Sequence, residues 1–227
     1  MRVAVLFSGG KDSTSALYWA VKQGFEIKTL ITVLSDRNDS YMYHIPNAEL
    51  TKFQAEAMNF SLIFIHSTGI KEKELIELKE ILADLKKQKL IDGIVTGALA
   101  SVYQASRIQK ICDDLKLKCF NPLWQKNQEQ YLKDLLKQKF EVMIVGVAAA
   151  GLDEKWLGRM IDKKAIQELI ELEKKFKINV AAEGGEFETF VLNCPIFKKK
   201  LKVVKAQTLW HGNRGEYLIK EIKLVKK

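Results

Sequence analysis

An uninterrupted apolar run near the start of the chain, from Val3 to Phe7, ends at a pair of glycines. Such a run is typical of a parallel strand that is buried on both faces. Beyond the glycines, apolar residues recur at the spacing of one helix face: Ala16, Leu17, Ala20 and Val21. The sequence therefore predicts a strand, a tight turn and a helix, which is the opening unit of many α/β folds.

The turn itself has the chemistry of a phosphate-binding loop. Gly9 and Gly10 allow close approach of the backbone, Lys11 adds a positive charge, and Ser8 and Ser13 add hydroxyls at the positive end of a helix. A plain connecting turn would explain the glycines but not the charged and hydroxyl residues. The spacing fits neither a Walker A loop nor a dinucleotide fingerprint.

Strands and helices alternate along the first two thirds of the chain. Further apolar runs lie at 27–34, 62–65, 91–96, 120–124 and 142–147. Helical patterns lie between them at 47–58, where Asn47 is expected to be the cap, and at 70–89, 101–115 and 128–139. This alternation predicts a doubly wound, mostly parallel, Rossmann-like sheet of about five strands.

The pattern changes after residue 150. Helices are expected at 152–159 and 163–176, and apolar residues then alternate with lysines at 200–206 and 217–225, as in antiparallel strands with one wet face. We therefore expect two domains, an N-terminal one at 1–120 that carries the phosphate-binding turn and a smaller C-terminal α+β one at 121–227; the family resemblance described below implies that they bind ATP and the substrate.

The ligand crevice of an open parallel sheet lies beyond the carboxyl ends of the strands, where the strand order reverses. Ser35 ends the second expected strand and Gly97 follows the fourth. Both are expected to border the nucleotide, with Thr32 to Ser35 as a wall for the adenine. Close packing of a helix would also explain Gly97.

Composition limits the class of protein. A hydrophobic content of 47% with 29% charged residues is ordinary for a soluble domain, and no apolar stretch is long enough for a membrane span or a leader peptide. Three cysteines lack metal or redox spacing and are expected to be structural: Cys112, Cys119 and Cys194. A cytoplasmic location is expected.

Much of the formal charge of +9 lies at the end of the chain. Residues 195–227 carry ten lysines and arginines against two glutamates, a net charge of +8. Two interpretations remain open: a solvated strand surface, or a docking face for a polyanion such as RNA or an acidic protein.

A second group of functional residues surrounds the turn Gly184-Gly185. Glu183, Glu186 and Glu188 lie within six residues, and like charges so close together repel. A solvated loop tolerates this, but apolar runs on both sides place the turn at the edge of the core. Carboxylates in such a place suit Mg²⁺, ammonium or a cationic substrate.

The Ser8–Ser13 loop resembles the Ser-Gly-Gly-x-Asp-Ser signature of the PP-loop ATP pyrophosphatases. Further stretches, in order along the chain, resemble the diphthine–ammonia ligase family of that superfamily: 40–44, Thr96-Gly97-Ala98, Tyr103-Gln104 with Arg107, Pro122-Leu123-Trp124, Gly151-Leu152 with Leu157-Gly158-Arg159, and Glu183 to Thr189. Ala182 departs from the glycine that the family tends to have. The resemblance implies the adenine nucleotide alpha hydrolase-like form of the Rossmann-like fold.

The resemblance also implies a reaction. ATP with Mg²⁺ would adenylate the carboxylate of diphthine, a modified histidine of translation elongation factor 2, and free ammonia would displace AMP to give diphthamide. Lys11 and the rest of the loop would stabilise pyrophosphate, while Asp12 would orient the loop or hold Mg²⁺. Glu186 is the expected site for ammonium and its proton.

The implied substrate site would hold the trimethylammonium group of diphthine. The acidic turn supplies charge, Trp124 or Tyr103 supplies an aromatic wall, and cation–π contact is worth about 0.5–2 kcal/mol per ring. His44 and Arg107 belong to the matching stretches and are expected at the same site. The basic tail would steer the chain towards the elongation factor, no membrane or nucleic acid is expected as partner, and a homodimer is possible.

Two other functions remain open. A PP-loop enzyme that activates a base in tRNA would use the basic tail as an RNA face, although a recognisable RNA-binding module and a thiolation cysteine pair are missing. A non-catalytic adenine nucleotide-binding module would bind ATP without releasing pyrophosphate.

Overall fold

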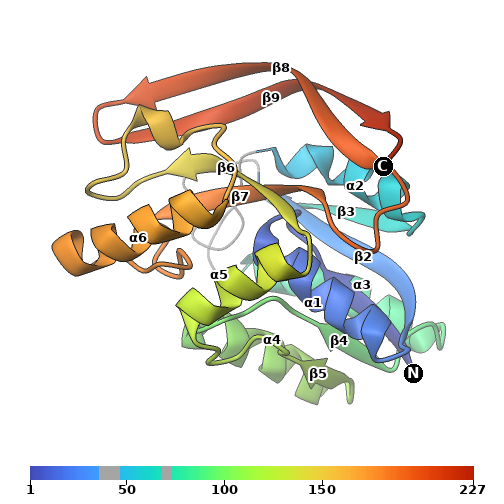
Figure 1. Ribbon diagram of the computed structural model, residues 1–227. Helices are drawn as coiled ribbons and strands as arrows, with labels where there is room; N and C mark the ends of the chain where they lie inside the picture. The colour runs from blue at the N-terminus through green and yellow to red at the C-terminus, as the bar shows by residue number, and fades with distance from the viewer. Residues whose placement is uncertain (36–46, 68–72) are drawn as a thin grey trace.

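Two sheets organise the computed structural model, which describes residues 1–35, 47–67 and 73–227 (Figure 1). In these residues the first sheet has five parallel strands in the order β3-β2-β1-β4-β5. Its strands are β1 (Arg2–Leu6), β2 (Glu26–Ser35), β3 (Leu62–Ser67), β4 (Gly93–Val95) and β5 (Lys118–Phe120). The predicted doubly wound parallel sheet is confirmed.

Helices cover both faces of this sheet. The helices of the first part are α1 (Lys11–Lys22), α2 (Thr51–Met58) after a 3₁₀ turn η1 (Ala48–Leu50), α3 (Lys73–Lys87) and α4 (Val102–Asp114). One core cluster packs Ala4, Ile31 and Ile94 of the sheet against apolar residues of α3 and α4. The opposite face contributes Val3 and Val5 to a second cluster with α1, α2 and α5 (Gln128–Lys137).

The second sheet is antiparallel, with the order β7-β6-β9-β8. Its strands are β6 (Glu141–Val147), β7 (Phe187–Asn193), β8 (Lys200–His211) and β9 (Arg214–Val225), and η2 (Glu154–Trp156) and α6 (Lys163–Phe176) lie between β6 and β7. The predicted antiparallel C-terminal region is confirmed. Its apolar residues, including Phe190, join the same core cluster as α1, so the two sheets share a core.

Three local predictions are wrong. The 142–147 run was expected in the parallel sheet, but β6 pairs with β7 and β9 in the antiparallel one. In place of a helix at 152–159 there is only the short turn η2, after which Leu157 is extended. Asn47 has a φ of 67° and makes no capping hydrogen bond. Its side chain instead binds the backbone of β9, accepting from Ile219 N at 2.8 Å and donating to Tyr217 O at 2.9 Å.

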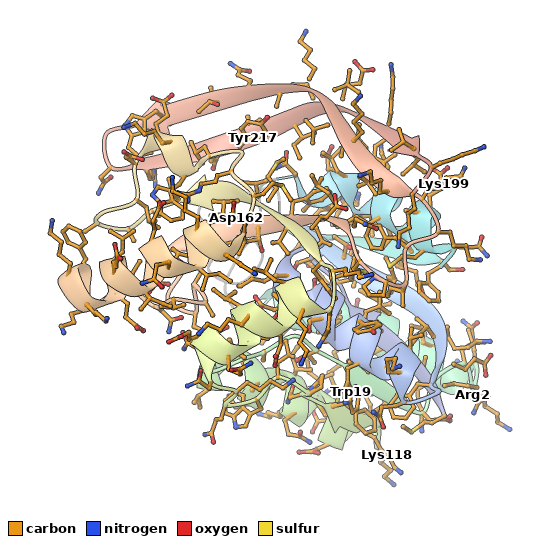
Figure 2. The ribbon with its side chains drawn as sticks, in the orientation of Figure 1. Arg2, Trp19, Lys118, Asp162, Lys199 and Tyr217 are labelled. Atoms are coloured by element: carbon orange, nitrogen blue, oxygen red, sulfur yellow. The ribbon has the colours of Figure 1, made fainter. Side chains whose placement is uncertain are left out.

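The basic tail forms the long β8–β9 hairpin, which runs along the top of Figure 1 above α2. Tyr217 and Lys199 mark this side of the molecule in Figure 2, opposite Trp19 and Lys118. Lys202 and Lys223 are directly paired across the hairpin. No helix in the described ranges is long and apolar enough to cross a bilayer.

Candidate functional site

The reversal point of the parallel sheet lies between β1 and β4. β1 pairs with β2 on one side and with β4 on the other, and the chain runs outward from it in both directions. The loops that follow β1 and β4 therefore border the place where open α/β sheets bind ligands. This is the location predicted from the sequence, and Ser35 lies at the end of the neighbouring β2.

The loop after β1 needs glycine at position 9. Gly9 has a φ of +80°, in the left-handed region of backbone conformation that residues other than glycine rarely adopt. A Cβ there would lie 2.4 Å from Gln54 Oε1 and 3.0 Å from Thr51 Cγ2. Gly10 is extended and is followed by α1, and its Cβ would lie 3.2 Å from the carbonyl oxygen of Thr189. The turn is closely packed against α2 and β7.

Strand β7 holds this loop by hydrogen bonds to the loop's backbone. Val191 N donates to Gly9 O at 2.9 Å, and Lys11 N, a free donor at the start of α1, donates to Thr189 Oγ1 at 3.1 Å. Gln54 Nε2 bridges the two segments, since it donates to Gly9 O at 2.9 Å and to Val191 O at 2.7 Å. An edge strand of the antiparallel sheet is thus attached directly to the loop.

The charged residues of the loop are held by a partly buried network. The Lys11 side chain is only 3% exposed, and its Nζ lies 2.8 Å from Asp12 Oδ2 and 5.7 Å from the ring centroid of Phe187. Tyr131 of α5 donates to Asp12 Oδ1 at 2.9 Å. Burial, followed by the Asp12 charge, raises the pKa of Tyr131 well above its usual value, so the phenol stays a hydrogen-bond donor.

The serines of the loop bind one another. Ser8 N donates to Ser13 Oγ at 3.2 Å, the two hydroxyl oxygens are 3.1 Å apart, and Ser13 Oγ donates to Gly10 O at 3.2 Å. Gly97, in the loop after β4, packs on the start of α1: a Cβ there would lie 2.7 Å from Asp12 C and Ser13 N. Helix packing is therefore sufficient to explain this glycine, and its contact with a nucleotide stays a prediction.

The three glutamates of the acidic turn differ in their hydrogen bonds. Glu183 Oε2 accepts from Ala100 N, in the loop after β4, at 2.7 Å. Glu186 binds the backbone of its own turn: Oε1 accepts from Asn179 N at 2.7 Å and Oε2 from Gly184 N at 2.8 Å. Glu188 lies within β7, directly before Thr189. The acidic turn and the loop after β1 therefore meet at one end of the parallel sheet.

Two of these carboxylates have perturbed pKa values. Burial raises the pKa of Glu188 to about 7, an effect that the Lys11 charge opposes and the Asp12 charge reinforces. Burial, followed by the Asp12 charge, also raises the pKa of Glu183, while its hydrogen bond from Ala100 N lowers it. Such shifts mark carboxylates that lie near other charges in a partly dry place, as functional sites often do.

The expected aromatic residues lie in α4 and in the turn after β5. Tyr103 and Arg107 share a face of α4, as predicted, with Arg107 Cζ 3.5 Å from the Tyr103 ring centroid. Trp124 is half-buried in the turn after β5, where the next residue, Gln125, donates its N–H to Leu99 O. The expected His44 lies outside the described residues.

Several residues of the site carried no signal in the sequence. Tyr131 and Gln54 lie in helical stretches whose sequence pattern predicts an ordinary core residue and an ordinary surface residue. Only the tertiary fold brings them to the loop. Thr189 belongs to a stretch that the sequence indicated, but its contact with Lys11 was not expected. In the described residues no group of three or more histidine, cysteine, aspartate or glutamate side chains is arranged to hold a metal.

Comparison with known proteins gives a consistent family. The family model "Diphthamide synthase N-terminal domain" matches residues 1–119, and "Diphthamide synthase C-terminal domain" matches residues 127–225. A human relative named diphthine–ammonia ligase is 37% identical, over 93% of this chain and 86% of its own length. A zebrafish relative of the same name is 33% identical, over 94% of this chain and 90% of its own.

A protein described as a predicted subunit of tRNA methyltransferase from Methanocaldococcus jannaschii is 19% identical. It covers 86% of this chain and 98% of its own, with a TM-score of 0.47. On the two family models and the curated relatives, which together span nearly the whole sequence, this chain belongs to the diphthamide synthase family.

Proposed function

We propose that this chain is a diphthine–ammonia ligase, which uses ATP to convert the carboxylate of diphthine on translation elongation factor 2 into an amide. One structural observation supports this beyond the family. The phosphate loop is hydrogen-bonded to the strand that carries the acidic turn, through Lys11 N and Thr189 Oγ1 at 3.1 Å. A site for an anionic nucleotide and a site for a cationic substrate are therefore next to each other, as amide formation through an acyl-adenylate requires.

The first step joins the diphthine carboxylate to AMP. A carboxylate oxygen forms a bond to the α-phosphorus of ATP, and the bond from that phosphorus to pyrophosphate breaks. Lys11, whose ammonium is buried and already positioned by Asp12, would stabilise the charge that develops on pyrophosphate. The hydroxyls of Ser8 and Ser13 and the backbone of Gly9 and Gly10 would surround the same phosphates.

The adenosine part of ATP would lie beyond the parallel strands. Ser35 ends β2, which borders β1, and the loop that contains Gly97 follows β4 on the other side. Backbone groups of these segments would contact the adenine and the ribose, in the manner of other open α/β sheets.

Mg²⁺ fits this site as a companion of ATP. Nucleotide sites usually bind it through one or two carboxylates together with phosphate oxygens, so a cage made only of protein ligands is not needed. Asp12 is such a carboxylate, and among the described residues one of its oxygens accepts from Tyr131 and the other from Lys11, which leaves lone pairs for a metal. Bound there, Mg²⁺ would supply further positive charge to the phosphates.

The acidic turn would receive the trimethylammonium group of diphthine. Glu183 and Glu186 would provide the charge, the turn Gly184-Gly185 presents them, and Trp124 or Tyr103 would provide the aromatic wall. Arg107 and His44 would contact the rest of the modified histidine or its surroundings. Free ammonia is the expected nitrogen donor, and a chain that acts on an elongation factor is expected in the cytoplasm.

The test is pyrophosphate release from ATP in the presence of ammonium and elongation factor 2 that bears diphthine. Wild-type chain should require the diphthine form. Lys11→Ala should lower the rate about ten- to a hundredfold, because a charged hydrogen bond is worth about 1.5–3 kcal/mol. Lys22→Ala is the matched control, since Lys22 is an exposed lysine at the other end of α1. Pyrophosphate release at the same rate with and without the elongation factor would refute the proposal.

The β8–β9 hairpin favours one alternative, a PP-loop enzyme that adenylates a base in tRNA. Lys202 and Lys223 are paired across the hairpin, where like charges are unfavourable, and a polyanion would offset their repulsion further than Glu221 does, whose Oε1 lies 3.5 Å from Lys223 Nζ. Bulk tRNA in place of the elongation factor distinguishes the two: pyrophosphate release that requires tRNA would establish the alternative. A chain that binds ATP but releases no pyrophosphate with either acceptor would be a nucleotide-binding module.

A further inference from the structure

The hydrogen bonds of the acidic turn separate its three glutamates into structural and available carboxylates. Both oxygens of Glu186 accept backbone N–H groups, from Asn179 at 2.7 Å and Gly184 at 2.8 Å. A Cβ added at Gly184 would lie 2.8 Å from Glu186 Oε1, so the carboxylate is enclosed by its own turn. Carboxylates bound in this way shape a loop and keep little capacity to accept hydrogen bonds from ammonium, whereas a trimethylammonium group has no N–H to donate and needs only their charge.

Glu183 is also committed, since its Oε2 accepts from Ala100 N at 2.7 Å. This bond ties the acidic turn to the loop after β4, which borders the proposed nucleotide site. Its role is to hold these two segments together. Glu183 and Glu186 each accept backbone hydrogen bonds, so neither carboxylate has both oxygens open to a new ligand.

Glu188 is different, because no hydrogen bond or ion pair to its carboxylate occurs among the residues that the structure describes. It is half-buried and lies opposite Gly146 of β6, which has no side chain to cover it. It directly precedes Thr189, which binds Lys11 N, and the charges of Lys11 and Asp12 both act on its pKa. Within the described residues, the oxygens of this half-buried carboxylate therefore accept no hydrogen bond and are open to a small cation.

We propose that Glu188, rather than Glu186, binds the ammonium ion that attacks the acyl-adenylate; this inference rests on the proposed ligase function. Ammonium is small enough to reach a half-buried carboxylate, and Glu188 lies on the strand that is hydrogen-bonded to the phosphate loop. Ammonium must lose a proton before it is a nucleophile, and a carboxylate in contact with it accepts that proton.

The step balances as follows. One N–H proton of ammonium passes to Glu188, and the nitrogen lone pair forms a bond to the acyl carbon. The bond from that carbon to the AMP oxygen then breaks, and AMP leaves with the electron pair. The nitrogen releases a second proton to water, which leaves the amide. Glu188 returns its proton to solvent before the next turnover.

Two nucleophiles test this role in the full chain with ATP, Mg²⁺ and diphthine-bearing elongation factor 2. Ammonium needs a cation site and a proton acceptor, whereas hydroxylamine is largely uncharged near neutral pH and traps acyl-adenylates as hydroxamates. Glu188→Gln should lower kcat/KM for ammonium at least about a hundredfold, the low end of general-base effects, and change hydroxamate formation less than about threefold. Glu186→Gln, the matched control, should affect both nucleophiles equally, through the shape of the turn.

An equal loss of both products in Glu188→Gln would refute the role of Glu188, as would a selective loss of ammonium reaction in Glu186→Gln. If Glu188→Gln does not fold, Glu188→Asp replaces it, with the same selective loss expected from the shortened side chain. A wild-type chain that forms neither amide nor hydroxamate would instead refute the ligase function. If the wild-type chain forms both amide and hydroxamate, and Glu188→Gln lowers both equally, the ligase function stands and only the role of Glu188 is refuted.

Discussion

The strongest test of the loop geometry is Gly9→Ala. Gly9 has a φ of +80°, and a Cβ would lie 2.4 Å from Gln54 Oε1. Gln54 is fully buried and cannot simply turn away, because its Nε2 donates to Gly9 O and Val191 O. The substitution therefore imposes both backbone strain and a clash with a fixed side chain.

These two costs can be estimated separately. An alanine in the left-handed region costs about 1–2 kcal/mol. Overpacking of a well-packed place costs about 1–3 kcal/mol more. The free energy of unfolding should therefore fall by about 2–5 kcal/mol. At about 2–4 °C per kcal/mol for a chain of this size, the melting temperature should fall by roughly 4–20 °C.

Gly24 provides the matched control. Its φ is +71°, but no atom lies within 4 Å of an added Cβ, so Gly24→Ala should cost only the strain of about 1–2 kcal/mol. Urea unfolding of both variants gives the two free energies, and ATP titration should show weaker binding for Gly9→Ala alone. Equal destabilisation of the two variants, or unchanged ATP affinity in Gly9→Ala, would refute the described packing of the loop.

Three other perturbations have definite expected outcomes. Tyr131→Phe should lower the free energy of unfolding, measured in urea, by about 1.5 kcal/mol, near the low end for bonds to charged groups, because the Asp12 side chain is 27% exposed and water replaces part of the bond. Asn47→Gly should lower the free energy of unfolding by about 1–3 kcal/mol, because two hydrogen bonds to β9 are lost. Asn47→Ala should lower it by about 1 kcal/mol more, because the φ of 67° strains an alanine but not a glycine. Equal melting temperatures of the two variants would contradict this. Because the pKa of Glu188 is raised to about 7 in the folded chain, the folded state keeps a proton that the unfolded chain releases near pH 4.5, so stability should fall between about pH 4.5 and 7. Urea unfolding at pH 5 and pH 8 should show a smaller fall in Glu188→Gln.

The phosphate loop and its place in the fold could be predicted because their causes are local. An apolar run, two glycines and a helical period fix a strand, a turn and a helix without reference to the rest of the chain. The reversal point between β1 and β4 then follows from the general behaviour of open parallel sheets. The same local reasoning located the acidic turn, since the spacing of Glu183, Glu186 and Glu188 is visible in the sequence.

The wrong predictions arose where tertiary burial imitates a local pattern or where a distant hydrogen bond replaces a local one. β6 is buried on both faces, so its apolar run cannot be told from a parallel strand, although its partners are antiparallel. Leu152 and Trp156 are both buried and four residues apart, which imitates one face of a helix around the short turn η2. Asn47 has the chemistry of a cap, but its side chain binds β9, some 170 residues later in the chain.

The partners of the phosphate loop show why a site cannot be completed from motifs alone. Three of its groups are bound from the C-terminal part of the chain: Gly9 O by Val191 N, Lys11 N by Thr189 Oγ1, and Asp12 Oδ1 by Tyr131. Each partner is an ordinary residue in its own stretch, and its meaning depends on a contact across more than 100 residues. The sequence motif specifies the atoms that the proposed function assigns to the nucleotide, whereas these distant contacts specify their positions. A change in β7 that alters the acidic turn would therefore also displace the phosphate loop, so the proposed adenylation and amidation sites are mechanically one unit.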